Sequence, residues 1–200
     1  MNRALVLHTP AGHLLGQFAL PEALPDSPRG LVLLPKAHRV AVDDPNTLIF
    51  RQAGYAVLAI ELLSEREMHY ADAAQDVARL GARLLDVLAL AERDGDMERL
   101  PLVIFASGEA TPAALRAAAR RDAQVRALAV HGGPLDRAGL EALRMLAAPL
   151  LMLTDVDAGE PGWQRAAAHL GCPHAAQRLA PGETAGSAAV AWFGRWLAAT

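Results

Sequence analysis

Five short apolar runs, each followed by a turn signal and then by a helical segment, constrain the fold of this chain more than any other feature. The runs consist of Leu, Val, Ile, Ala, Met, Gly and aromatic residues, with Arg126 as their one charged residue. Such runs are typical of strands that are covered on both faces of a sheet. They are Gly30 to Leu34, Tyr55 to Ile60, Leu102 to Phe105, Val125 to Val130 and Leu150 to Leu153.

The segments between these runs carry helical periodicity. In the longest of them, Val77, Leu80, Leu84 and Leu88 fall on one helical face. Strands that alternate with helices predict a mostly parallel sheet with helices on both sides. The predicted helices are Asn46 to Gln52, about Asp72 to Glu92, Thr111 to Arg121, Arg137 to Leu146 and Gly162 to Leu170.

The two ends of the chain complete this architecture. Ala4 to His8 and His13 to Leu20 flank a tight turn and predict an antiparallel hairpin. Ala175 to Leu179 predicts a weak last strand, and Ser187 to Ala199 a closing helix. We therefore expect an α/β protein: a three-layer α/β/α sandwich in one domain, residues 1–200, with no lid domain. A chain of 200 residues is long enough to bury a full core.

The stretch from Pro101 to Leu115 holds the first candidate for chemistry. An apolar strand leads into the small residues Ala106-Ser107-Gly108, and Thr111-Pro112 then opens an Ala-rich helix, with Thr111 expected as its N-cap. A serine between a strand and a helix has the shape of a nucleophile elbow. The helix N-terminus there favours developing negative charge.

Two interpretations of this stretch remain open. The elbow pattern is G-x-S-x-G, but Phe105 and Glu109 stand where the two glycines belong. Ser107 is therefore either a catalytic nucleophile or part of an ordinary strand-to-helix turn.

A serine nucleophile needs a base, and the base needs an orienting acid. In a parallel sheet these groups come from loops beyond the carboxyl ends of the strands. Asp157 is the predicted acid, with Asp155 as the competitor, and either carboxylate could simply cap its turn. His131 is the predicted base because it ends the strand after that of Ser107, although it could equally pack within its own turn. His38 is a second candidate base, and Glu109 a weaker one.

Composition excludes several other classes of function. The net charge of −3 argues against a nucleic-acid partner, which usually needs a basic face. Cys172 is the single cysteine, so there is no internal disulfide and no cysteine zinc site. We predict no cofactor, because no G-x-G-x-x-G motif is present.

Two sets of polar residues deserve comparison with metal sites. They lack the tight ligand spacing of known sites, so we predict no metal. The sets are His38 with Asp43 and Asp44, and Glu65 with Glu67 and His69.

No apolar run is long enough to span a bilayer, and Pro10 interrupts the early residues where a signal peptide needs an apolar centre. We therefore expect a cytoplasmic protein without a membrane partner. The oligomeric state stays open.

From about Gly30 onward the chain resembles the α/β-hydrolase superfamily, specifically its dienelactone hydrolase-like group. Leu102 to Leu115 is similar to that group's strand, G-A-S-T-G elbow and Ala-rich helix, and Pro149 to Asp157 to its "PTLLIVGGxD" strand. The resemblance implies Ser107 as nucleophile and Asp157 as acid. The other similar segments are Phe50 to Ser64, Val130 to Asp136, where His131 replaces the usual Arg, and Trp192 to Leu197.

The departures from the group fall on its catalytic parts. Its "HGSGSS" loop is replaced by Pro35 to Val40, and its "PGAtH" segment aligns with Pro181 to Ala185, so that Ala185 stands where the histidine belongs. The resemblance thus implies a hydrolase of small esters or lactones with an incomplete Ser-His-Asp triad. The alternative is a catalytically inactive hydrolase-fold protein that binds a small molecule or a protein.

Overall fold

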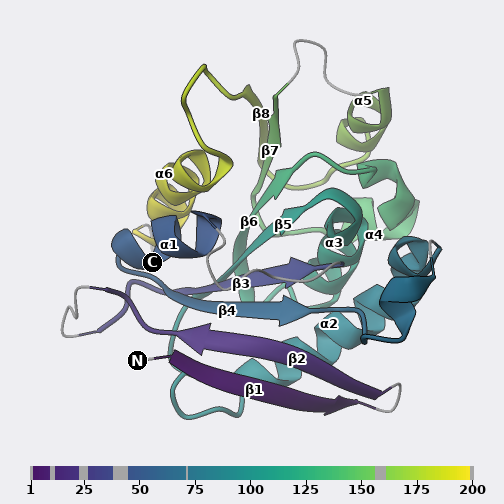
Figure 1. Cartoon of the computed structure of the whole chain (residues 1–200). Coiled ribbons are helices and arrows are strands. Elements are labelled where there is room, and N and C mark those ends of the chain that lie inside the picture. Colours follow the sequence, from purple (N-terminus) through teal and green to yellow (C-terminus); the bar gives the residue numbers. More distant parts are fainter. Residues whose placement is uncertain are drawn as a thin grey trace.

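The computed structural model describes residues 2–9, 12–22, 27–37, 45–70, 72–155 and 161–198 (Figure 1). These residues form an eight-stranded sheet in the order β1-β2-β4-β3-β5-β6-β7-β8. Strands β3 to β8 run parallel, and the β1–β2 hairpin adds two antiparallel strands at one edge, as the sequence predicts. The strands are β1 (Asn2–Thr9), β2 (Gly12–Ala19), β3 (Leu31–Lys36), β4 (Ala56–Glu61), β5 (Leu102–Ser107), β6 (Val125–His131), β7 (Leu150–Thr154) and β8 (His174–Arg178).

Helices cover both sides of this sheet, which confirms the predicted α/β/α layers. Figure 1 shows α1 and α6 together on one side, whereas α2, α3 and α4 lie on the other. Short 3₁₀ segments connect some elements. The helices are α1 (Pro45–Gln52), α2 (Val77–Ala91), α3 (Thr111–Arg120), α4 (Leu140–Met145), α5 (Pro161–Ala167) and α6 (Ala185–Leu197), and the 3₁₀ segments are η1 (Glu67–His69), η2 (Ala73–Gln75), η3 (Gly108–Ala110) and η4 (Leu135–Ala138).

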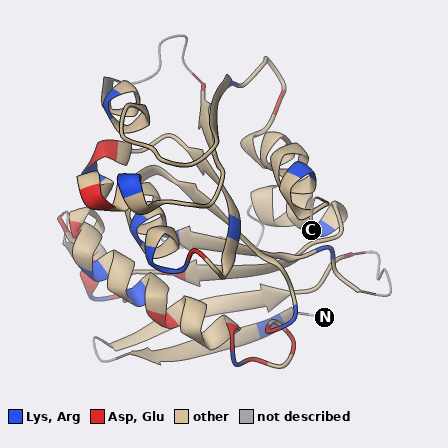
Figure 2. Ribbon diagram, turned by 180° about the vertical axis from the view of Figure 1, so that it is seen from behind, with Lys and Arg blue, Asp and Glu red and all other residues tan. Residues whose placement is uncertain are grey.

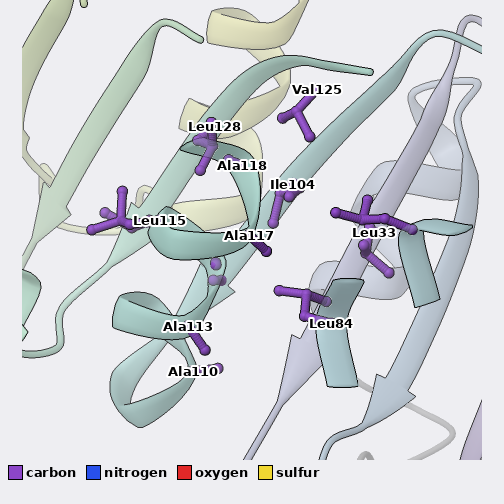
Figure 3. Close-up of a cluster of buried hydrophobic side chains, with 14 of the residues drawn as sticks. Leu33, Leu84, Ile104, Ala110, Ala113, Leu115, Ala117, Ala118, Val125 and Leu128 are labelled. Carbon is purple, nitrogen blue, oxygen red and sulfur yellow. The ribbon is translucent and has the colours of Figure 1, made fainter. Parts of the chain in front are cut away.

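Two apolar clusters hold the layers together, one on each side of the sheet. Alternate residues of each strand point to opposite sides, so β5 gives Ile104 to one cluster and Phe105 to the other. Figure 3 shows Ala117 of α3 beside Ile104 of β5, and Leu84 of α2 beside Leu33 of β3. Because alanine side chains are small, α3 lies close to the sheet, and its Ala-rich face is buried there.

The order in which successive strands are added to the sheet reverses between β3 and β5, although both strands run parallel. From β3 the chain passes to β4 on one side, and from β5 it proceeds through β6, β7 and β8 on the other. The β3–β5 pairing ends at Leu33 and Ile104, three residues before each strand ends. In parallel sheets such a switch point opens a crevice where ligands bind.

Several predicted helix boundaries differ from the structure. The helix predicted to reach Leu170 ends at Ala167, and the closing helix begins at Ala185 instead of Ser187. The long helix begins at Val77, because the Asp76 carboxylate accepts a hydrogen bond from the Arg79 N–H at 3.0 Å and caps it there. The helix predicted for residues 137–146 is interrupted at Gly139, whose φ of 90° is not helical. Thr111 is not an N-cap: it is the first residue of α3, and its hydroxyl donates to the Gly132 carbonyl at 3.0 Å.

A buried ion pair fixes the loop that follows β4. The Arg83 side chain is 2% exposed, and its guanidinium contacts the Glu67 carboxylate at 2.7 and 2.8 Å. The same guanidinium donates to the Leu62 carbonyl at 2.6 Å, and the Ser64 hydroxyl donates to Glu67 at 2.7 Å. Hydrogen bonds from Arg83 hold the pKa of Glu67 at about 2.

Charged side chains are interspersed over the surface. Figure 2 shows Lys and Arg mixed with Asp and Glu along the helices and loops, with few charges on the strands. Within the ranges given above, no helix combines the length and the apolar character that a bilayer crossing requires.

We predict that Glu67→Gln lowers the free energy of unfolding at neutral pH by about 3 kcal/mol, because it leaves the buried Arg83 guanidinium without its counter-charge. Since the pKa of Glu67 is lowered from 4.5 to about 2 in the folded chain, its contribution is complete above about pH 4.5 and is lost as the pH falls toward 2. Urea unfolding over this pH range measures both effects.

The matched control is Glu98→Gln, because Glu98 pairs at 3.6 Å with Arg99, which is 91% exposed. We expect it to cost less than about 0.5 kcal/mol. Equal costs for the two variants would contradict a structural role for the Arg83–Glu67 pair.

Candidate functional site

Polar residues mark the carboxyl ends of four neighbouring parallel strands. Each is the last residue of its strand and follows a fully buried run: Glu61 on β4, Lys36 on β3, Ser107 on β5 and His131 on β6. All four are partly exposed. We call this set the strand-end row.

The pairing of the strands makes these residues neighbours. Lys36 lies opposite Glu61 in the β3–β4 register, and Ser107 lies opposite His131 in the β5–β6 register. Register partners in a parallel sheet point to the same side. The preceding alternate residues, among them Leu34 and Phe105, belong to the cluster under α1 and α6, so the row points to that side.

The sharp bend between β5 and α3 lies at Gly108. Gly108 has φ +55°, in the left-handed region that favours glycine, whereas Ser107 has the extended angles φ −138° and ψ 150°. In a nucleophile elbow, the serine sits on the strained residue of the turn itself. Here the turn residue carries no side chain, and Ser107 precedes it.

The position of the bend suggests a different alignment with the elbow pattern. With Gly108 at the centre of G-x-S-x-G, the two glycine positions fall on Ala106 and Ala110, both small and both buried. A Cβ placed on Gly108 would meet no atom within 4 Å. A side chain on the bend residue would therefore have room, but this residue is glycine and carries no nucleophile.

The bend is fixed by the loop that follows β6. A Cβ on Gly133 would overlap the carbonyl oxygen of Gly108, so the two backbones touch where only glycine fits. The Thr111 hydroxyl donates to the Gly132 carbonyl, and the Trp163 indole N–H donates to the Gly133 carbonyl at 3.1 Å. The sequence alone assigns no role to this Gly132-Gly133 pair.

The His131 imidazole contacts the carboxylate of Asp155. Its Nε2 lies 2.9 Å from the Asp155 Oδ2, with the histidine side chain 29% exposed and the aspartate 70%. Within the ranges that the structure describes, the Ser107 hydroxyl has no hydrogen bond. The structure thus places Ser107 and His131 side by side and joins His131 to Asp155.

Other sequence-predicted residues are placed as follows. The Glu109 carboxylate lies 3.5 Å from the Arg137 guanidinium. Asp157 and His38 lie outside the described residues, as do Asp43 and Asp44. Within the described ranges, no group of three His, Cys, Asp or Glu side chains could hold a metal ion.

The segment that resembles the family's histidine segment starts a helix instead. Thr184 caps α6 through a reciprocal pair of hydrogen bonds with Ser187. Ala185 is the first residue of α6 and is 7% exposed in the cluster with Ala188 and Ala189. No imidazole is therefore available at this position.

Lys36 is the one lysine of the chain, and it stands at the switch point between β3 and β5. Its partial burial lowers the pKa of the ammonium group. At the Glu61 end of the row, a cavity of about 520 Å³ opens, lined also by Leu15, Leu63 and Ser64. Sequence reasoning did not select Lys36 or Glu61 as side chains of the site, although the end of an apolar strand is the signal for both.

The arrangement of strands and helices matches known hydrolases. The dienelactone hydrolase of Anabaena variabilis superposes with a TM-score of 0.78 at 23% identity, covering 98% of this chain and 96% of that one. A lidless serine hydrolase of Xanthomonas campestris superposes with a TM-score of 0.62 at 16% identity, covering 88% and 84%. The chain has the α/β-hydrolase fold. The resemblance to the dienelactone hydrolase-like group is confirmed at the level of the fold.

Two curated relatives come from Mycobacterium tuberculosis, strains CDC 1551 and H37Rv, and both are named "Putative phosphoribosyl transferase". Each is 32% identical over 149 residues, which is 72% of this chain and 31% of the relative. The chain thus spans about a third of their length, and their name describes a much longer protein. No protein-family profile matches the sequence.

We predict that Gly133→Ala lowers the free energy of unfolding by at least about 2 kcal/mol, because the new methyl group overlaps the Gly108 carbonyl and the Thr111 hydroxyl. Gly132→Ala is the matched control: Gly132 also has positive φ, but a Cβ there meets nothing within 4 Å. It should cost only about 1 kcal/mol. Denaturant unfolding of both variants gives the comparison, and equal costs would show that the loops do not rely on this contact.

Proposed function

We propose that this protein binds a small ester- or lactone-like molecule at the strand-end row and does not hydrolyse it. The observation that carries the proposal is the glycine at the bend. Without a side chain on the strained residue of the turn, the elbow has no nucleophile to present to a bound carbonyl.

The expected base is also missing from its usual segment. Ala185 takes that place and is packed into the apolar cluster at the start of α6. Loss of a triad member costs several orders of magnitude in rate. Two separate departures, at Gly108 and at Ala185, favour binding over turnover.

The row retains what a carbonyl ligand needs for recognition. Lys36 supplies a partly desolvated cation, Ser107 a hydroxyl, and the bend supplies backbone N–H groups at the N-terminal end of the η3–α3 segment. The adjacent cavity beside Glu61 provides room for the body of a ligand, with Leu15 and Leu63 as its apolar walls. The fold that this chain shares with a dienelactone hydrolase supports the same class of ligand.

One observation favours a second function, hydrolysis of such an ester by Ser107. His131 is the register neighbour of Ser107, and its Nε2 lies 2.9 Å from the Asp155 carboxylate. In this reaction His131 would take the serine proton as general base, with the acid role passing from the predicted Asp157 to Asp155. The Gly108 N–H and one from the Lys36–Ala37 segment would hold the oxyanion.

Turnover and binding separate the two functions. We expect purified protein to show no hydrolysis of short acyl esters or lactones above the level of Ser107→Ala, and no fluorophosphonate label on Ser107, because the hydroxyl is one residue away from the bend. Activity that depends on Ser107 would establish the second function in place of the first.

Binding is measured by the rise in melting temperature with the same lactones and esters. Ser107→Leu should abolish the rise because the larger side chain fills the row, whereas Ser107→Ala should retain most of it. Absence of both binding and turnover would reject both functions.

A further inference from the structure

A second cavity lies on the opposite side of the sheet, between α3 and the η4–α4 segment, which pack against each other. Its volume is about 370 Å³, within the range of sites for small molecules. It is lined by Arg116, Ala119, Arg120, Arg137, Ala138, Gly139, Leu140, Glu141, Ala142 and Met145. We call it the arginine groove.

The charge of this groove is opposite to that of the chain. Three arginines and one glutamate line it, whereas the whole chain has a net charge of −3. Arg116 and Arg120 are four residues apart on α3, so their like charges lie on one face of the helix and repel each other. Within the described ranges, neither guanidinium has a hydrogen bond or an ion pair. An anion between them would relieve this repulsion.

The third arginine is already held in position. Arg137 donates to the Gln75 carbonyl at 2.8 Å and lies 3.5 Å from the Glu109 carboxylate. A guanidinium with a fixed orientation loses little freedom when it accepts a further anionic partner. Arginine also presents paired N–H donors that match the oxygens of a carboxylate or a phosphate.

The remaining walls of the groove are apolar. Ala119, Ala138 and Ala142 line it, and Leu140 and Met145 are 45% and 55% exposed beside them. Large apolar side chains with this exposure gain by contact with an apolar group. The groove therefore combines a cationic part with an apolar part.

We propose that the arginine groove binds a small organic anion, with its carboxylate or phosphate on Arg116 and Arg120 and its apolar chain across the alanines to Leu140 and Met145. The strand-end row points to the other side of the sheet, so this site is separate from the proposed function and does not depend on it.

Isothermal titration of the full chain with octanoate and with octyl phosphate tests the proposal. We expect at least one of the two to bind, and the double variant Arg116→Ala/Arg120→Ala to weaken that binding by roughly tenfold or more, through loss of charge-assisted hydrogen bonds. Binding of octanoate alone identifies a carboxylate site, binding of octyl phosphate alone identifies a phosphate site, and binding of both shows recognition of the charge and the chain.

The matched control is Arg99→Ala/Arg126→Ala, which removes the same charge from another cavity of similar size, about 380 Å³. That cavity is also lined by Glu92 and Glu98, so its positive and negative charges balance. The control should leave the affinity unchanged. Absence of binding by both probes, or equal loss in the two double variants, would overturn the proposal.

Discussion

The backbone contact between Gly108 and Gly133 is the constraint on which the rest of this structure depends. It brings the loops after β5 and β6 together with no side chain between them. The hydroxyl of Thr111 and the indole of Trp163 then bind the two carbonyls of the Gly132-Gly133 pair. Because the start of α3 is fixed in this way, the ends of the central strands and the bend at Gly108 keep a defined geometry.

This geometry belongs to the backbone and does not depend on which side chain stands at the bend. The bend, the parallel strands and the helix that follows are those of the fold, and the position at the bend is glycine. Fold and chemistry are separable, since a scaffold orients whatever side chains its strands carry. An elbow without a nucleophile still offers backbone N–H groups and a helix N-terminus, which recognise a carbonyl oxygen without attacking its carbon.

The layers and strand locations follow from the sequence because buried parallel strands need continuous apolar runs, and all five runs became strands. The location of the bend could not be predicted from the sequence, because Ala106, Ser107 and Gly108 are all small and any of them could end the strand. The strand continues to Ser107, where it pairs with His131, and this single residue decides whether a serine or a glycine stands on the turn. The small residues at 106 and 110 are the sequence signal for the alignment centred on Gly108.

Several arginines of the chain hold its loops in place, whereas its single lysine stands in the strand-end row. Arginines bind the carbonyls of loops and turns, as Arg83 does for Leu62 and Arg51 for Leu20, because a guanidinium stays charged when buried and offers several donors at once. Lys36, the single lysine, stands instead at the switch point of the sheet. Burial lowers the pKa of the Lys36 ammonium group, whereas a guanidinium at the same strand end would keep its charge. In the binding function proposed above, this ammonium group and the Ser107 hydroxyl would be donors to the oxygen of a carbonyl ligand.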